Sequence, residues 1–272
     1  MTAPTVQRAR QWAVADREPA TADEAVVLDR VSLTYPGDAG RPAVLQDVSL
    51  TVHEGEFVCL LGASGCGKST MLSLIAGLAS PTSGTVDVPA GRSALMFQES
   101  ALFPWLTAGE NVELALKLRG VGRRERRDRA HDLLGRVHLV GHHGTRVHEL
   151  SGGMRQRVAL ARALAQEARV LLMDEPFAAL DAITRDVLHE ELMSVWGSSG
   201  MSVVFVTHNV REAVRLGQRV ELMSSRPGRF VRRWNVDIDG PRRIESPEVG
   251  ALALEITDDL RREIRRHAEV TS

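Results

Sequence analysis

The sequence reads Glu56-Phe57-Val58-Cys59-Leu60-Leu61-Gly62-Ala63-Ser64-Gly65-Cys66-Gly67-Lys68-Ser69-Thr70, and this stretch decides the fold. It begins with a short apolar run, which is typical of a buried strand, and then passes through a glycine-rich loop. Apolar residues at helical spacing follow the loop, at Met71, Leu72 and Ile75. A strand, a loop of the form Gly-x4-Gly-Lys-Ser and a helix, in this order, predict a phosphate-binding loop in an α/β domain.

The loop carries the groups that hold the phosphates of a nucleotide together with Mg²⁺. Its glycines let backbone N–H groups turn toward phosphate oxygens without a clash from a Cβ atom, and the N-terminal end of the next helix adds positive potential. We expect Lys68 to reach the β- and γ-phosphates and the Ser69 hydroxyl to bind Mg²⁺. A further hypothesis is that alkylation of Cys66 blocks access of the nucleotide. The residues expected at the nucleotide are Gly62, Ala63, Ser64, Gly65, Cys66, Gly67, Lys68, Ser69 and Thr70.

An apolar run that ends in two acids supplies the carboxylates that such a loop needs. The segment Val170–Glu175 is typical of a buried strand with Asp174 and Glu175 at its tip. We expect Asp174 to bind the Mg²⁺ ion, and Glu175 to orient the attacking water and accept a proton from it. A second apolar run, Val203–Val206, comes shortly before His208, which we expect to contact the γ-phosphate.

The pattern along the chain predicts an α/β fold with a mostly parallel sheet flanked by helices, because near-continuous apolar runs alternate with helical patterns. Shorter strands between residues 26 and 52 are separated by turns and indicate a small antiparallel layer. An α-helical subdomain is expected as an insertion at about residues 99–165. The expected divisions are a disordered segment at 1–24, a nucleotide-binding domain at 25–231, and a partly helical C-terminal extension at 232–272.

Composition favours an ordinary globular protein. Apolar residues make up 43% and charged residues 25%, and the formal net charge of −1 gives no general attraction to nucleic acid or lipid. No apolar run approaches the length of a membrane span, and the N-terminal segment lacks the apolar core of a signal peptide. The two cysteines, Cys59 and Cys66, match no metal or disulfide framework, which favours a reducing cytosol.

A second glycine-containing motif lies far from the loop. Residues 150–156 read Leu-Ser-Gly-Gly-Met-Arg-Gln, which resembles the signature of ATP-binding cassette (ABC) ATPases, the motor subunits of ABC transporters. Ser151 can cap the helix that follows and also meet a phosphate oxygen, and the two glycines allow a close approach to the backbone. In that family each nucleotide lies between the loop of one subunit and the signature of the other. The resemblance therefore implies a head-to-tail dimer, expected here to be a homodimer.

The resemblance also implies roles for residues that match the family's motifs by position. Tyr35 matches the aromatic that stacks on adenine, although a strand aromatic in the core is the alternative. Gln98 matches a catalytic glutamine that touches Mg²⁺ and water and couples the helical insertion to the rest. Asp181 matches an aspartate that crosses to the partner subunit, and His208 matches the switch histidine. ATP and Mg²⁺ are the implied ligands, and the partner's nucleotide would meet Ser151, Gly152 and Gly153.

Three segments resemble one subgroup of this family, the ATPases of nitrate, sulfonate and taurine importers. They are residues 97–107, 173–185 and 224–229. The chain differs from that group at Ala178, where glycine is usual, and just before the signature, where a proline is usual. Such an ATPase energises uptake of a small anion or sulfonate-type solute through integral membrane permease subunits, served by a solute-binding protein. It lies peripherally at the cytoplasmic face of the inner membrane. Phe103 and Trp105 are either anchors for a permease helix or core aromatics of the insertion.

The rival function is that of an ABC-type ATPase acting on nucleic acid or ribosomes. The arginine-rich segment Arg119–Arg129 would suggest it, but Glu125 and Asp128 interrupt the positive charge and favour a solvated helix face. The sequence has neither the long coiled coils nor the paired cassettes usual in that class. It also lacks the Asn-Lys-x-Asp motif of GTPases. We therefore expect no nucleic-acid partner.

Overall fold

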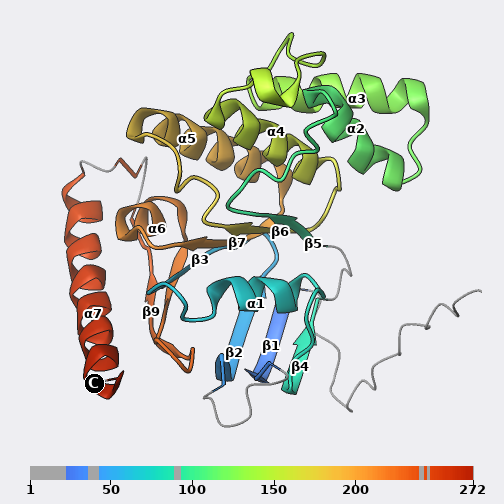
Figure 1. Cartoon of the computed structure of the whole chain (residues 1–272). Coiled ribbons are helices and arrows are strands. Elements are labelled where there is room, and N and C mark those ends of the chain that lie inside the picture. The colour runs from blue at the N-terminus through green and yellow to red at the C-terminus, as the bar shows by residue number, and fades with distance from the viewer. Residues whose placement is uncertain (1–22, 36–42, 89–92, 239–241, 244–245, 272) are drawn as a thin grey trace, which may run out of the picture.

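A six-stranded sheet forms the centre of the molecule (Figure 1). The computed structural model describes residues 23–35, 43–88, 93–238, 242–243 and 246–271, so nearly all of the segment expected to be disordered, at 1–24, lies outside the described residues. The strand order is β5-β6-β7-β3-β8-β9, with parallel pairing throughout except between β8 and β9. This arrangement confirms the predicted α/β fold. The strands are β3 (Phe57–Gly62), β5 (Ser93–Met96), β6 (Val170–Asp174), β7 (Ser202–Thr207), β8 (Arg219–Met223) and β9 (Phe230–Asn235).

A smaller antiparallel sheet has the order β2-β1-β4, as the sequence indicated for this layer. The apolar runs Val26–Leu28 and Val31–Thr34 predict two short strands, but the structure has one continuous strand, β1, whose pairing with β2 is irregular around Arg30, at a positive φ of 46°. The pattern Pro81-Thr82-Ser83-Gly84 predicts a turn, but strand β4 already begins at Ser83. The strands are β1 (Glu24–Leu33), β2 (Leu45–His53) and β4 (Ser83–Asp87).

Helix α1 (Lys68–Ile75) lies between the two sheets (Figure 1). Successive side chains of a strand point to opposite faces, so Val58 and Leu60 of β3 join the core around α1. Cys59 and Leu61 join the core on the other face of the main sheet. Because both faces are covered, β3 is buried along its whole length, which explains its uninterrupted apolar sequence.

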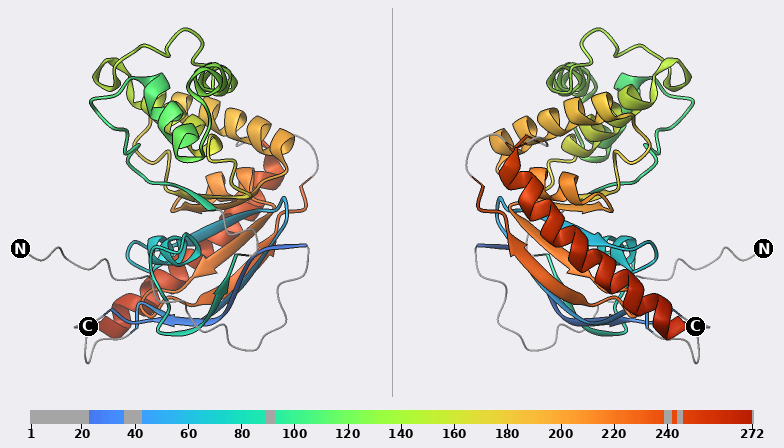
Figure 2. Two further views of the ribbon diagram at one scale, coloured as in Figure 1. Left: turned by 90° about the vertical axis from the view of Figure 1, so that its right-hand side faces the viewer. Right: turned by 90° about the vertical axis from the view of Figure 1, so that its left-hand side faces the viewer.

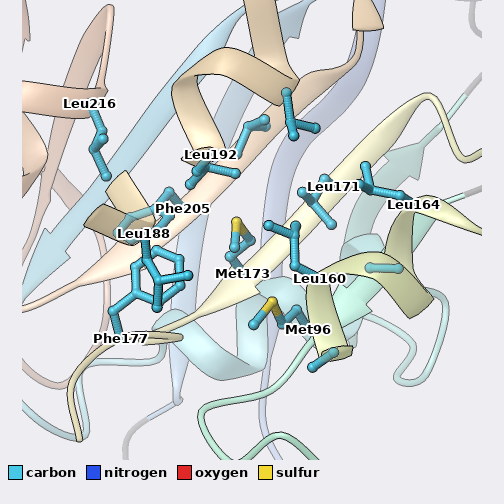
Figure 3. Close-up of a cluster of buried hydrophobic side chains, with 14 of the residues drawn as sticks. Met96, Leu160, Leu164, Leu171, Met173, Phe177, Leu188, Leu192, Phe205 and Leu216 are labelled. Carbon is cyan, nitrogen blue, oxygen red and sulfur yellow. The ribbon is translucent and has the colours of Figure 1, made fainter. Parts of the chain in front are cut away.

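Helices cover the second face of the main sheet. Figure 3 shows Met173 of β6 and Phe205 of β7 packed with leucines of three helices, among them Leu160, Leu188 and Leu216. The helices on this face are α4 (Gly152–Leu164), α5 (Ala182–Ser199) and α6 (Val210–Leu216). Helices α2 (Ala108–Leu118) and α3 (Arg123–Arg136) pack on α4, and the 3-10 turn η1 (Val147–Glu149) precedes α4. The side chains of Arg123, Arg124 and Arg127 on α3 are exposed, as expected of a solvated face.

The C-terminal helix α7 (Pro247–Thr271) runs across the β9 edge of the molecule (Figure 2). Its apolar side packs Val249 and Ile256 into the core beside α6. The indole N–H of Trp234, on β9, donates a hydrogen bond of 3.0 Å to Glu255 of α7. The domain boundary expected at residue 231 falls inside β9, so the main sheet continues four residues into the expected extension. Among the described helices, none combines the length and apolar character needed to cross a bilayer.

Candidate functional site

The glycine loop joins β3 to α1 in a conformation that depends on glycine. Gly67 caps α1 with a φ of 103°, a left-handed conformation that disfavours other residues. A Cβ atom at Gly67 would lie 2.6 Å from Leu45 Cδ2, and one at Gly62 would lie 2.6 Å from Cys66 Sγ. The loop is therefore tightly packed on the side of Leu45, and a pocket lies over its other side.

A pocket of about 440 Å³ lies over this loop, a volume within the range of small-molecule sites. Tyr35 and Val44 border one part of it and Glu175 another. Tyr35 is exposed, so its alternative interpretation as a core aromatic is wrong. The loop and α1 contribute Ser64, Gly65, Gly67, Lys68, Ser69 and Thr70.

Lys68 folds back over the inner side of the loop. Its ammonium group donates hydrogen bonds to the carbonyls of Gly62, at 2.8 Å, and Ala63, at 3.0 Å. The Cys66 thiol lies 3.7 Å from the same nitrogen and is 1% exposed. Burial raises the pKa of the Cys66 thiol, although the nearby ammonium partly opposes this. A buried thiol with a raised pKa reacts slowly, so alkylation of Cys66 is disfavoured as a means of blocking the pocket.

The two acids at the end of β6 lie beside the loop and beside β7. The Ser69 side chain lies close enough to Asp174 to lower the pKa of its carboxyl. Glu175 takes a positive φ of 45°, and its N–H donates to the carbonyl of Val206 at 3.0 Å. Its carboxylate accepts a hydrogen bond of 2.7 Å from the Nδ1 of His208, which follows β7. The structure thus brings the loop, both acids and the histidine to one edge of the sheet, the carboxyl end of its parallel strands.

The ionised carboxylate of Asp174 destabilises the folded protein. Burial raises the pKa of this carboxyl, the nearby Ser69 side chain lowers it, and the negative charge of Glu175 raises it further. Since the native state holds this proton more tightly than the unfolded state, the ionised carboxylate lowers stability at neutral pH. That penalty is absent at pH values below the ordinary pKa of an aspartic acid, about 3.9.

We expect Asp174→Asn to raise the melting temperature of the protein without nucleotide or metal at pH 7, with a gain that vanishes near pH 3. The same variant should lose ATP hydrolysis by about 100-fold or more, because metal-ion catalysis contributes several kcal/mol. Thermal unfolding between pH 3 and 8 and a phosphate-release assay measure the two effects. A destabilised variant at pH 7, or one with normal hydrolysis, would contradict this description of Asp174.

The side chain of His208 is 60% exposed, but its neighbour Thr207 belongs to a buried hydrogen-bond network. Thr207, the last residue of β7, donates its hydroxyl to the Glu212 carboxylate, whose other oxygen lies 2.6 Å from His189 Nε2. The His189 ring packs edge-on against Phe177, with ring centroids 5.6 Å apart. The turns that leave β6 and β7 are therefore tied together beneath the surface. Sequence reasoning missed this network, and its only signal was a histidine and a glutamate at otherwise apolar helix positions.

Gln98 lies outside the residues that line the pocket and is held by α4 instead. Its carbonyl accepts a bond of 2.8 Å from Gln156 Nε2. The guanidinium of Arg162, also on α4, donates to the carbonyls of Ala101, at 2.7 Å, and Ser100, at 2.9 Å. The segment 98–101 is thereby fastened along one side of α4, whose first turn is the signature-like motif.

The signature-like residues do not line the pocket of their own chain. Ser151 caps α4 by accepting from the Met154 N–H at 3.2 Å, and none of Ser151, Gly152 and Gly153 lines that pocket. A Cβ atom at Gly153 would lie 2.7 Å from Thr184 Cγ2, so the starts of α4 and α5 touch. Asp181 caps α5, and the N–H of Thr184 lowers the pKa of its carboxyl. The motif and Asp181 thus share one exposed surface.

Arg226 borders the pocket although sequence reasoning assigned it no role. It lies in the turn between β8 and β9, and its Nη2 would be 3.9 Å from a Cβ atom placed on Gly65. The available signal was its position just after β8, which pairs with β3 in parallel. Parallel neighbours end at the same edge of a sheet, which here carries the glycine loop.

Such a loop beneath a pocket of this size, with carboxylates at a nearby strand end, is the defining arrangement of P-loop nucleoside triphosphatases. The chain is 48% identical to the taurine import ATP-binding protein TauB of Burkholderia pseudomallei (strain 1710b) over 215 residues. This alignment covers 76% of this chain and 83% of that protein. The chain belongs to the ABC transporter family, whose family model matches residues 45–178, and is an ATP-binding subunit and an ATPase of that family.

Two further comparisons agree with this assignment. The nitrate import ATP-binding protein NrtD of Synechocystis sp. (strain ATCC 27184 / PCC 6803 / Kazusa) is 46% identical over 213 residues, 76% of this chain and 80% of that protein. The ATP-binding cassette MJ0796, in a dimeric post-hydrolysis state bound to ADP and Pi, aligns with a TM-score of 0.70 at 35% identity, covering 79% of this chain and 100% of that chain. A role on nucleic acid or ribosomes is not supported by these similarities.

Proposed function

We propose that this chain is the ATPase of an importer for a small anion or sulfonate-type solute, such as nitrate, an alkanesulfonate or taurine. The observation that carries the proposal is the 44–48% identity to taurine and nitrate import proteins over most of their length. It acts as a peripheral subunit on the cytoplasmic face of the inner membrane, beneath a permease that receives its solute from a binding protein. The helical subdomain at about 99–165 and the nucleotide-binding domain at 25–231 remain our proposed divisions.

ATP occupies the pocket over the loop, with its adenine against Tyr35 and its phosphates along the segment from Gly62 to Thr70. Ser69 and Asp174 present adjoining oxygen ligands of the hard type that Mg²⁺ prefers, so the residues fit this ion, and Gln98 would join them after a movement of its loop. Bound Mg²⁺ would neutralise charge on the β- and γ-phosphates.

Hydrolysis needs a base for the attacking water and a group that positions the γ-phosphate. Glu175 accepts the water proton while the water oxygen bonds to the γ-phosphorus and the bond to the bridging oxygen of ADP breaks. His208 holds the Glu175 carboxylate through the 2.7 Å bond and contacts the γ-phosphate from the end of β7. The products are ADP and phosphate.

The dimer completes the site. Ser151, Gly152 and Gly153 of one subunit contact the nucleotide held by the other, and Asp181 lies beside them. Their shared exposed surface and their absence from the pocket of their own chain support a head-to-tail homodimer. ATP closes this dimer, and hydrolysis with phosphate release reopens it.

The permease docks in a groove of about 500 Å³ beside α2. Leu95, Phe103 and Leu118 line the groove, and Arg119 and Arg162 add two cations. Trp105 is 68% exposed next to Phe103, with ring centroids 5.4 Å apart, so it is not a core aromatic of the insertion. An amphipathic helix of the permease suits such a groove.

The test is recovery of the protein in mild detergent with the permease encoded beside it, followed by uptake assays in vesicles with taurine, alkanesulfonates and nitrate. We expect Phe103→Asp to lower permease recovery about tenfold or more, since a charge replaces an exposed apolar side chain that the permease helix would bury, and to leave ATP binding intact. Leu254→Asp is the matched control, because Leu254 is also exposed but lies on α7. Recovery with ribosomes or nucleic acid, or normal recovery of Phe103→Asp, would contradict the proposal.

A further inference from the structure

The turn between β8 and β9 is a closed, internally bonded loop. The Ser224 hydroxyl donates to the carbonyl of Pro227 at 2.8 Å and accepts from the N–H of Arg229 at 2.9 Å. The N–H of Ser224 donates to the carbonyl of Arg229 at 2.8 Å. Three bonds around one serine fix the backbone on which Arg226 stands.

This turn is also bound to the elements around the pocket. The N–H of Gly228 donates to the carbonyl of Val44 at 2.9 Å, and the carbonyl of Gly228 accepts from Gln46 at 3.0 Å. A Cβ atom at Gly228 would lie 2.2 Å from the carbonyl oxygen of Cys66, so the turn touches the glycine loop directly. The position of Arg226 relative to the loop is therefore set by backbone contacts on both sides.

The guanidinium of Arg226 has N–H donors available for an anion in the pocket. Two cations line the pocket among the described residues, Lys68 and Arg226, and Lys68 directs its donors to loop carbonyls. Within the described ranges, no carboxylate pairs with Arg226, whereas Arg219 and Arg233 nearby in sequence both pair with Glu221. A guanidinium that faces the glycine loop in this way is suited to phosphate oxygens, which it binds through two parallel N–H bonds.

We propose that Arg226 binds the phosphate chain of the nucleotide on the side of the loop marked by Gly65. This inference rests on the proposed function, since it assumes that ATP occupies the pocket. It adds a binding residue from the β8–β9 turn to those of the loop. Because Arg226 is exposed, the contact is weaker than a buried one and is screened by salt.

The experiment measures the Kd of MgATP by calorimetry for the full-length protein and three variants at low and high salt. Arg226→Ala should weaken binding about tenfold at low salt, equal to about 1.4 kcal/mol, with a smaller difference at high salt. Arg226→Lys, which keeps the charge but cannot form two parallel N–H bonds, should recover only part of the loss. Arg229→Ala is the matched control from the same turn, because its side chain borders a different pocket with Gln46 and Asp47. Equal melting temperatures show that the variants are folded.

Three results would overturn the proposal. They are an unchanged Kd for Arg226→Ala, an equal loss in Arg229→Ala, and an equal loss for adenosine in competition, which would place the guanidinium at the base. A wild-type protein that does not bind ATP would overturn the proposed function as well. Normal wild-type binding with an unaffected Arg226→Ala variant overturns the Arg226 contact alone.

Discussion

Glu175→Gln is expected to bind ATP normally and to hydrolyse it about 100- to 10,000-fold more slowly, the range usual for loss of a general base. The amide keeps the size of the carboxylate and can still meet His208, but it cannot take a proton from water. Because the γ-phosphate then stays in place, the variant should remain dimeric in the presence of ATP. Single-turnover phosphate release and size-exclusion chromatography with and without ATP measure the two effects.

The control for this experiment is Glu190→Gln, which makes the same chemical change at a carboxylate that is 77% exposed on α5. It should hydrolyse ATP at the wild-type rate. Unimpaired hydrolysis by Glu175→Gln would show that the proton goes elsewhere. A variant that fails to bind ATP would mean that Glu175 serves binding rather than the chemical step.

Two inactive variants are expected to restore activity to each other when they form a mixed dimer. Lys68→Ala removes the phosphate contact of the loop, and Gly152→Asp places a negative charge where the partner's nucleotide would approach. Space exists for this aspartate, because a Cβ atom at Gly152 would meet only Leu180, at 3.7 Å. Its charge also suits the N-terminal end of α4. Each variant alone should lose about 100-fold or more in hydrolysis.

In a mixed dimer the two defects fall on the same site, so the other site has an intact loop and an intact signature. With equal amounts of both subunits, half of the dimers are mixed, and roughly a quarter of all sites should recover. Co-expression with two different tags and sequential purification isolates the mixed dimer. Two differently tagged copies of Lys68→Ala serve as the control and should stay inactive. If the mixed dimer is no more active than this control, the two motifs do not meet across a dimer.

The sequence was sufficient to predict the parts of the fold in which local pattern and burial agree. The runs at β3, β6 and β7 are apolar throughout because both of their faces are covered, so their length and their polar ends were readable. The strands that it missed, β4, β8 and β9, carry polar residues at several positions. Buried Arg219 and Glu221 of β8 are accommodated by pairing with each other, and such a pair hides a buried strand from any apolar pattern.

The candidate site shows the same division. Lys68, Asp174 and Glu175 follow from spacing alone, because a loop and a strand end fix where they stand. Arg226 and the His189–Glu212 pair depend on contacts between segments far apart in the chain, which no local pattern contains. The positive φ of Glu175 is likewise set by its bond to β7.

Helix α4 connects the segment 98–101 with the signature-like motif. Three side-chain bonds fasten the segment 98–101, next to the groove, to the same helix that begins at Ser151. In the proposed assembly this helix would connect the permease in the groove with the nucleotide of the partner subunit at Ser151. We infer that weakening these three hydrogen bonds would increase ATP hydrolysis that is not coupled to transport. The number of ATP molecules hydrolysed for each solute transported measures this loss of coupling.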